Sequence, residues 1–477
     1  MPSGQTLPSG TAPSPSSKEV LACLRDQFGH SIVLTPDSAH WPSTIQRDWS
    51  DATAVEPIAI LEPQCTKDVC EILRFCSTKA IPLAIQGGMT GLVGGANTQE
   101  GEVVLSLGRL NQIEHIDPVA GTALVQAGVT LEQLQIAAQE LDWFFPLDLG
   151  ARGSCQIGGN AATNAGGNRV IRYGMMRNAV LGLEVVLADG RCMDRLDSVI
   201  KNNAGFDLKQ LFIGSEGLLG VITKLVIQLE PRPRAQCTAL CALSDFSQAT
   251  QLLKLFKRVL PELSAFEVMW HAYLHESARH QKLDAPFLQE YPLYVLVETL
   301  GHDNASSTQA LEEALQRALE DETIVDAVLA QSAEQSQKLW AYREGVSGLL
   351  SALKPFAAFD VSVALPQMDL LVQELRGALS SRFKSQSHLF FGHLGDGNLH
   401  LLSGPYASKE ELLAVEGLVY QRVSALGGSI SAEHGIGVVK KDFLHYSKSP
   451  EEIELMRQLK QLLDPQNILN RGRVLSV

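Results

Sequence analysis

The sequence has little positive charge and no paired cysteine motif, and each absence narrows the range of functions. It holds 39 lysines and arginines against 53 aspartates and glutamates, which gives a net charge of −14. A chain this acidic would be repelled by a phosphate backbone, so we expect no nucleic-acid partner. An anionic substrate would also be repelled at long range. If the substrate is an acid, cations placed inside the site must hold it.

The eight cysteines are scattered through the first 241 residues, and none forms a CxxC pair. This usage is typical of a reduced intracellular enzyme, so we expect a cytoplasmic protein. No secretory signal is visible, because the start of the chain is rich in Ser, Pro and Gly and lacks an apolar segment. We predict a disordered tail over residues 1–19. The uncharged stretch 80–99 holds five glycines, so we expect a loop there and no transmembrane segment.

A length of 477 residues predicts two or three domains. In the first half, short apolar runs alternate with segments whose apolar residues recur at the spacing of an α-helix. Strands are expected at 58–62, 81–85, 103–107, 122–125, 181–187 and 221–229, and helices at 66–79 and 131–140. The run Pro231-Arg232-Pro233-Arg234 interrupts any regular element and predicts a domain boundary. Beyond it, helices at 246–257, 305–319 and 335–353 and strands at 293–298 and 356–363 predict an α+β domain, and a helix at 450–463 closes the chain.

Two glycine-rich loops, 86–95 and 148–167, are the main feature of the first half. Glycine lacks a Cβ, so its backbone N–H can come close to a pyrophosphate. The loops also carry neutral donors such as Thr90, Ser154 and Asn160. Neither loop reads GxGxxG at the start of a helix, which disfavours a nicotinamide cofactor. The alternative is that these glycines only form turns.

The second loop belongs to a longer pattern. The stretch 146–167 is followed by Arg172-Tyr-Gly, by 181–190 and by 203–217. Together they resemble the PCMH-type FAD domain of the vanillyl-alcohol-oxidase family, in the branch of FAD-linked D-2-hydroxyacid dehydrogenases. That branch includes D-2-hydroxyglutarate dehydrogenase, D-lactate dehydrogenase and the glycolate oxidase flavin subunit. The resemblance runs from about residue 40 to the C-terminus.

The resemblance implies an α+β fold. A two-subdomain FAD-binding domain over 20–235 would be followed by an α+β substrate (cap) domain over 236–430, and a C-terminal segment, 431–477, would complete the active site. The implied FAD-binding residues are Gly87, Gly88, Thr90, Gly91, Gly94, Gly95, Gly153, Ser154, Gly158, Asn160, Thr163, Gly217, Ile222 and Asn470. Some relatives attach FAD through a His or Cys of the first loop. Loop 86–95 has neither, so non-covalent FAD is expected.

A second site is indicated by the run 393–400, His-Leu-Gly-Asp-Gly-Asn-Leu-His. Asp396-Gly397 is a strong two-residue hairpin signal. A turn centred there would place His393 opposite His400, with Cβ atoms about 5 Å apart, close enough to share one metal ion. The alternative is that both histidines are ordinary packing or surface residues.

Glu433 and His434, flanked by Gly435 and Gly437, are expected in an irregular loop that adds a carboxylate and a third imidazole. Two histidines and a glutamate with an open position are typical of a catalytic metal site. The family resemblance implies His393, His400 and Glu433 as ligands of a divalent metal, with zinc favoured. It also implies His434 as the base and Asn398 near the flavin or substrate.

Arg343 and Ser347 are four residues apart in the expected helix 335–353 and would share a face. A guanidinium can grip a carboxylate with two hydrogen bonds, although a solvated surface arginine is the alternative. The family places its carboxylate-binding Arg and a hydroxyl at these positions. Two departures stand out. Ala358 occurs where close relatives carry Lys, which leaves the identity of the 2-hydroxy acid open, and Arg471 replaces the usual Pro of the closing motif.

The function expected is oxidation of a D-2-hydroxy acid such as 2-hydroxyglutarate or lactate, by hydride transfer from Cα to flavin N5. His434 would act as base, the metal would polarise the hydroxyl and Arg343 would orient the carboxylate. An electron-transfer flavoprotein, a quinone or a cytochrome would accept the electrons, and a homodimer is one expected assembly. Two alternatives stay open: a flavin-binding subunit of a glycolate oxidase-like complex, and a metal hydrolase without flavin.

Overall fold

The computed structural model describes residues 16–476. The first helix, α1 (Ser17–Phe28), begins inside the expected tail of 1–19. That prediction is wrong for its last residues, because Ser16 and Glu19 form a reciprocal capping box that starts the helix. The remainder of the expected tail lies outside the described residues.

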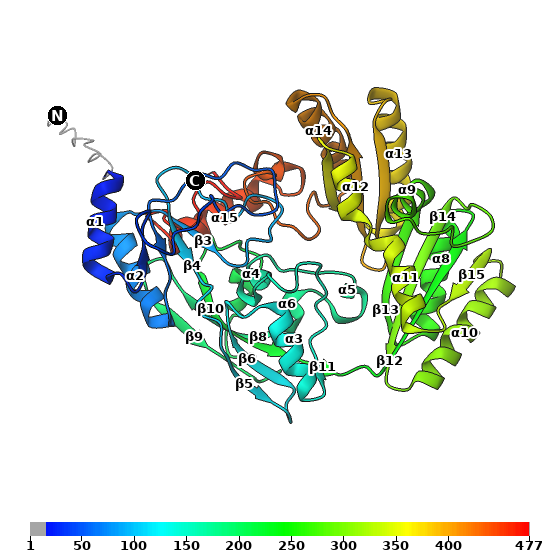
Figure 1. Cartoon of the computed structure of the whole chain (residues 1–477), viewed down its shortest axis with the longest axis horizontal. Coiled ribbons are helices and arrows are strands. Elements are labelled where there is room, and N and C mark those ends of the chain that lie inside the picture. Colours follow the sequence, from blue (N-terminus) through cyan, green and yellow to red (C-terminus); the bar gives the residue numbers. More distant parts are fainter. Residues whose placement is uncertain (1–15, 477) are drawn as a thin grey trace, which may run out of the picture.

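The N-terminal half contains two sheets of different kinds (Figure 1). The first has the order β1 (Val33–Leu34), β2 (Ile60–Leu61), β4 (Val103–Ser106) and β3 (Leu83–Gln86), with parallel pairing from β2 onward. The second is antiparallel, in the order β5 (Ile113–Asp117), β6 (Thr122–Gln126), β10 (Val221–Gln228), β8 (Val180–Val186) and β9 (Cys192–Arg195). One continuous apolar core joins the two sheets.

Helices cover and connect these sheets. They are α2 (Thr66–Lys79), α3 (Leu131–Glu140), α4 (Ile157–Ala162), α5 (Val170–Tyr173), α6 (Met176–Ala179) and α7 (Lys209–Phe212). The short strands β7 (Trp143–Phe144) and β11 (Glu230–Pro231) pair where the chain leaves this half. The chain then crosses residues 232–234 into β12 without a regular element, as the prolines there predict.

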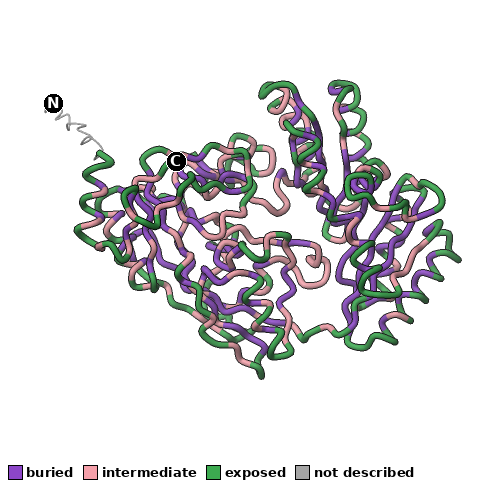
Figure 2. The backbone as a smooth tube through the Cα atoms, in the orientation of Figure 1, coloured by how far each residue is buried: buried purple, intermediate pink, exposed green. Residues whose placement is uncertain are grey.

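A seven-stranded sheet forms the C-terminal half. Its order is β15 (Asp326–Leu329), β12 (Ala235–Leu243), β14 (Leu293–Gly301), β13 (Leu263–Trp270), β17 (Ser387–His393), β18 (Asn398–Gly404) and β16 (Ala357–Ser362). All its pairings are antiparallel. Figure 2 shows the buried segments concentrated inside each half, with exposed helices around them.

Both faces of this sheet are covered. One packs against α8 (Phe246–Val259), α10 (Asn304–Glu320), α13 (Met368–Arg382) and α14 (Lys409–Ala425). The other packs against α9 (His271–Gln281), α11 (Ala333–Glu344) and α12 (Val346–Ala352), and it carries the candidate site at the β17–β18–β16 end. A 3-10 helix, η1 (Leu365–Gln367), precedes α13.

The end of the chain returns to the N-terminal half. After η2 (Lys441–Tyr446) and α15 (Pro450–Leu463), the backbone N–H of Leu83 donates to the carbonyl of Ile468 at 2.7 Å. Arg473 is fully buried there and pairs with the equally buried Glu102 at 2.6 Å. In Figure 1 these last elements accordingly lie beside the first ones. None of the helices between residues 16 and 476 combines the length and the apolar composition that a membrane span needs.

Candidate active site

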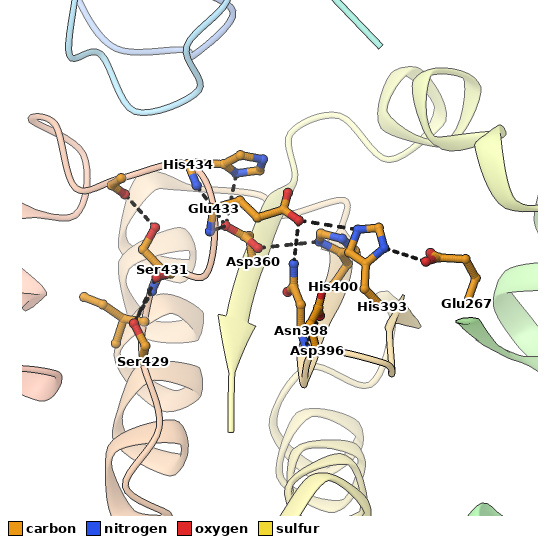
Figure 3. Close-up of polar contacts among 12 residues, drawn as sticks. Glu267, Asp360, His393, Asp396, Asn398, His400, Ser429, Ser431, Glu433 and His434 are labelled. Atoms are coloured by element: carbon orange, nitrogen blue, oxygen red, sulfur yellow. Dashed lines mark hydrogen bonds and ion pairs between the residues drawn. The ribbon is translucent and has the colours of Figure 1, made fainter. Parts of the chain in front are cut away.

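Three side chains meet at the end of β17, on β18 and in the loop after α14. His393 ends β17, His400 lies on β18, and Glu433 lies in an irregular loop, as predicted. One ligand atom from each lies within 4.8 Å of the others. Figure 3 shows the carboxylate of Glu433 turned toward the two imidazoles. This donor set is one that a catalytic zinc ion takes.

The hairpin that carries the two histidines has a different register from the predicted one. His400 pairs with Phe391, and a four-residue turn, 394–397, separates β17 from β18. The predicted direct opposition of His393 and His400 is therefore wrong by two residues. The longer turn is accommodated by Gly397, whose φ of +82° lies in the left-handed region. The two rings still share a face as diagonal neighbours, with centroids 5.0 Å apart.

Glu267, on β13, is a member of the site that the sequence motifs do not indicate. Its buried carboxylate accepts from Arg343 Nε at 2.7 Å and contacts His393 Nδ1 at 2.7 Å. Burial works to raise the pKa of Glu267, but His393 and Arg343 outweigh it and hold that pKa below its ordinary value. Burial would likewise lower the pKa of His393, yet Glu267 and Glu433 raise it to about 9. The available signal was a single charged residue inside a largely apolar stretch, 263–270.

Asp360, on β16, holds the loop of Glu433 and His434. Its Oδ2 accepts from the backbone N–H of Glu433 at 2.8 Å and of His434 at 3.1 Å, and lies 3.6 Å from His434 Nδ1. Burial raises the pKa of Asp360, but His434, Lys440 and His400 outweigh it and lower that pKa. Burial lowers the pKa of His434, so this imidazole is neutral near pH 7 and able to accept a proton.

The remaining polar groups leave room for a ligand. Asn398 donates to Glu433 Oε1 at 3.0 Å. Its own Oδ1 and the Oδ1 of Asp360 are buried without a hydrogen-bond partner among the described residues. Burial, reinforced by His393, lowers the pKa of His400 well below its ordinary value, which leaves the neutral imidazole that metals bind. Unsatisfied oxygens beside a neutral imidazole and a carboxylate fit a metal ion and a polar substrate.

Arg343 is buried rather than solvated. Its guanidinium carbon lies 4.6 Å from the ring centroid of Phe391, and Nη2 lies 3.4 Å from His393 Nε2. The predicted continuous helix 335–353 is wrong, because it is interrupted at Gly345 between α11 and α12. A Cβ at Gly345 would lie 2.2 Å from Ser277 Oγ, so close packing on α9 requires glycine. Ser347 lies beyond this break and is exposed.

Ala358 lies on the face of the sheet that carries the site. It is two residues before Asp360 on β16, so both side chains point to the same side, and Ala358 is exposed. Its cross-strand partner is Leu402 of β18. The methyl group of Ala358 therefore lies at the edge of the site, at the position where close relatives were expected to carry the ammonium group of a lysine.

The two glycine loops pack directly on each other. A Cβ at Gly88 would lie 2.0 Å from the carbonyl of Ser154, so this approach requires glycine. Beside it, Gln156 Oε1 is buried without a partner, and a Cβ at Gly159 would project into open space. The unpaired acceptor of Gln156 and the open space beside Gly159, both at the start of α4, fit a large polar cofactor.

The expected FAD-binding residues differ in exposure. Gly94, Gly158, Asn160, Gly217, Ile222 and Asn470 are buried, Gly87, Gly88, Thr90, Gly95 and Thr163 are half-buried, and Gly91, Gly153 and Ser154 are exposed. Ile222 packs in the core of the N-terminal half. Asn470 uses both ends of its amide within the protein: Oδ1 accepts from Ile85 N–H at 2.8 Å and Nδ2 donates to the Glu216 carbonyl at 2.7 Å.

The cluster of His393, His400 and Glu433 adjoins the FAD-binding half. A Cβ at Gly166, in the second glycine loop, would lie 3.9 Å from Glu433 Cγ. A Cβ at Gly395, in the turn of the histidine hairpin, would lie 2.5 Å from Ile171 of α5. The two predicted sites are therefore parts of one region between the halves.

Comparisons with known proteins agree with this arrangement. Residues 57–194 match the FAD binding domain, and residues 232–474 match the C-terminal domain of FAD linked oxidases. The chain is 42% identical to the mitochondrial D-2-hydroxyglutarate dehydrogenase of Rattus norvegicus, over 99% of this chain and 86% of the relative. It is 39% identical to a D-2-hydroxyglutarate dehydrogenase of Xanthomonas citri pv. viticola, over 90% and 91%. It is also 41% identical to a putative mitochondrial D-lactate dehydrogenase of Schizosaccharomyces pombe, over 88% and 82%.

Solved structures share the fold at low sequence identity. A p-cresol methylhydroxylase superposes with a TM-score of 0.77 at 18% identity, covering 96% of both chains. The 4-ethylphenol oxidase of Gulosibacter chungangensis gives 0.74 at 18% identity, over 98% of this chain and 99% of that one. These likenesses confirm the expected fold, a PCMH-type FAD-binding domain followed by an α+β domain. The chain belongs to the FAD-linked oxidase family that includes the D-2-hydroxyglutarate dehydrogenases.

Proposed function

We propose that this protein oxidises a D-2-hydroxy acid to the corresponding 2-oxo acid, with non-covalent FAD and a divalent metal, zinc being favoured. The observation that carries the proposal is the convergence of His393, His400 and Glu433 within 4.8 Å, next to the buried Arg343. The names of the relatives, D-2-hydroxyglutarate and D-lactate dehydrogenases, support the substrate class.

Each proposed role follows from a contact of the chain itself. Arg343 binds the substrate carboxylate, and its guanidinium is held in place by Glu267 and the Phe391 ring. His434 accepts the hydroxyl proton, since burial keeps its imidazole neutral and Asp360 fixes its backbone. Asn398, bonded to Glu433, presents its free Oδ1 to the same space.

His393, His400 and Glu433 would hold the metal, and the two glycine loops would hold FAD. When bound, FAD supplies the acceptor for the Cα hydride, and the metal supplies a Lewis acid for the substrate hydroxyl. Glu267 contacts His393 Nδ1 and so leaves Nε2, 3.5 Å from Glu433 Oε1, directed at the proposed metal position.

The choice among 2-hydroxy acids depends on the wall around Ala358. A second carboxylate would meet no cation at this position, whereas a short apolar tail would lie beside the exposed methyl group of Ala358. Electrons would leave to an electron-transfer flavoprotein, a quinone or a cytochrome. A cytoplasmic location and a homodimer are further parts of the proposal, to be tested by fractionation and by light scattering.

Anaerobic bleaching of the flavin tests the function. The purified protein should be yellow, and D-2-hydroxy acids should reduce its flavin while the L-enantiomers leave it oxidised. A colourless protein would favour a metal hydrolase instead. A yellow protein that no D-2-hydroxy acid reduces, unless a second protein is added, would favour a flavin-binding subunit of a larger complex.

A further inference from the structure

Glu216 is a half-buried carboxylate in the FAD-binding half that the roles described so far leave unused. It lies in the Gly-Ser-Glu-Gly turn after α7 and has a φ of +51°, a left-handed conformation that is uncommon for a glutamate. Its backbone N–H donates to the carbonyl of Ala162 at the end of α4 at 2.8 Å. Its carbonyl accepts from Asn470 Nδ2. Both contacts fix the backbone of Glu216 to the FAD-binding half.

The side chain of Glu216 reaches into the loop that carries the base. Oε1 accepts from the N–H of Ile436 and Oε2 from the N–H of Gly437, each at 2.8 Å. A Cβ at Gly435 would lie 2.8 Å from Glu216 Cδ, so glycine is required at that position for the contact. Both oxygens are therefore occupied by backbone amides, two and three residues beyond His434.

The same loop is also held by Asp360 of β16. Asp360 accepts the N–H groups of Glu433 and His434, whereas Glu216 accepts those of Ile436 and Gly437, beyond Gly435. One carboxylate comes from the substrate half and the other from the FAD-binding half. The segment 433–437 is thus bracketed by two anionic acceptors, each rigidly placed by a different half of the molecule.

The first glycine loop contacts this segment as well. Val438 N–H donates to the Val93 carbonyl at 2.9 Å, and a Cβ at Gly95 would lie 3.6 Å from Glu216 Oε2. The expected pyrophosphate loop, Glu216 and the loop that carries His434 are therefore packed against one another.

We propose that Glu216 is a positioning residue that sets the distance between the base His434 and the flavin. Asp360 places His434 relative to the metal ligands and the substrate, and Glu216 places the same loop relative to the FAD-binding half. The role of His434 rests on the proposed function, whereas the clamp between Glu216 and the two amides does not depend on it.

The decisive variant is Glu216→Gln, because the carboxamide keeps the shape but turns an NH₂ toward one of the two backbone N–H groups. Asp117→Asn is the matched control, since Asp117 also accepts two backbone amides, those of Val119 and Ala120, in an exposed turn of the same half. Hydrogen exchange of the peptide covering 433–438 should become faster in Glu216→Gln and stay unchanged in Asp117→Asn.

Flavin reduction supplies the functional readout. In FAD-loaded, metal-loaded Glu216→Gln, we expect reduction by D-2-hydroxyglutarate or D-lactate to slow on the order of 10- to 100-fold, with KM little changed. If little folded Glu216→Gln is obtained, Glu216→Asp replaces it, because the carboxylate is withdrawn by one bond and should produce the same two effects.

Unchanged hydrogen exchange over 433–438 would overturn the clamp. Faster exchange with a normal flavin reduction rate would overturn the positioning role. Failure of the proposed function is recognised separately, because then no D-2-hydroxy acid would reduce the wild-type flavin, while the exchange experiment would still test the clamp.

Discussion

Replacing Glu267 with Gln should weaken metal binding and destabilise the protein together. A single buried carboxylate contacts both Arg343 Nε and His393 Nδ1 at 2.7 Å, so a carboxamide can accept from only one of these two groups. If it keeps Arg343, His393 loses the partner of its Nδ1–H. The ring then favours the tautomer with the proton on Nε2, the nitrogen that faces Glu433.

Two magnitudes follow from this geometry. Removing one member of a buried ion pair costs about 3–5 kcal/mol of unfolding free energy. Loss of the carboxylate that orients a ligating histidine lowers metal affinity by about 10- to 100-fold. Denaturant unfolding of the metal-free protein measures the first, and metal retention against a graded chelator measures the second.

Glu298→Gln is the matched control for this experiment. Glu298 is equally buried on the neighbouring strand β14 and pairs with Arg169 Nε at 3.2 Å, and it makes no contact with the three proposed metal ligands. It should lose stability but bind metal as the wild type does. If Glu267→Gln and Glu298→Gln retain metal equally well, the orienting role of Glu267 is refuted.

Three further outcomes are expected. His434→Ala should keep flavin and metal but lose flavin reduction by substrate, and a normal reduction rate in a stopped-flow experiment would exclude His434 as the base. The pKa of His393 is raised to about 9 in the folded metal-free protein, so its stabilisation is fully present below its unfolded pKa of about 6.5 and is lost as pH rises through about 9. Unfolding free energy should fall by up to about 3 kcal/mol across that window, more than in His393→Gln, and parallel pH curves for the two proteins would contradict this. Ala358→Lys should raise kcat/KM for D-2-hydroxyglutarate relative to D-lactate, and an unchanged ratio would place the distal carboxylate elsewhere.

The sequence predicted that His393, His400 and Glu433 come together, but not their geometry. Histidines seven residues apart around a Gly-containing turn were enough to predict that His393 and His400 share a face. The register depended on the turn length, and Asp396-Gly397 suggested two residues where the structure has four. Since side chains alternate along a strand, an error of two residues preserves the face and changes the partner. The same-face prediction therefore survived the register error.

Contacts between residues far apart in the sequence could not be predicted from the sequence. Glu267 is separated from His393 by 126 positions, and Glu216 from Ile436 by 220. Glu216 lies in the stretch 203–217 that carries the family resemblance, but nothing in that stretch indicates its partner. Glu267 belongs to no such motif, and the pairing of β13 with β17 that brings it to His393 is not encoded locally. The need for glycine at the interruption was also hidden, because it depends on the close approach of Ser277 from another helix.

The buried pair of Glu102 and Arg473 has a consequence for the order in which the protein is made. The two residues are 371 positions apart, so the carboxylate emerges from the ribosome long before its counter-ion. A buried, unpaired charge destabilises the folded state. In addition, the edge of β3 lacks its backbone hydrogen-bond partners until residues 468–470 have been made. We therefore expect the N-terminal half to remain incompletely packed during synthesis and to close around its cofactor only when the last residues have been added.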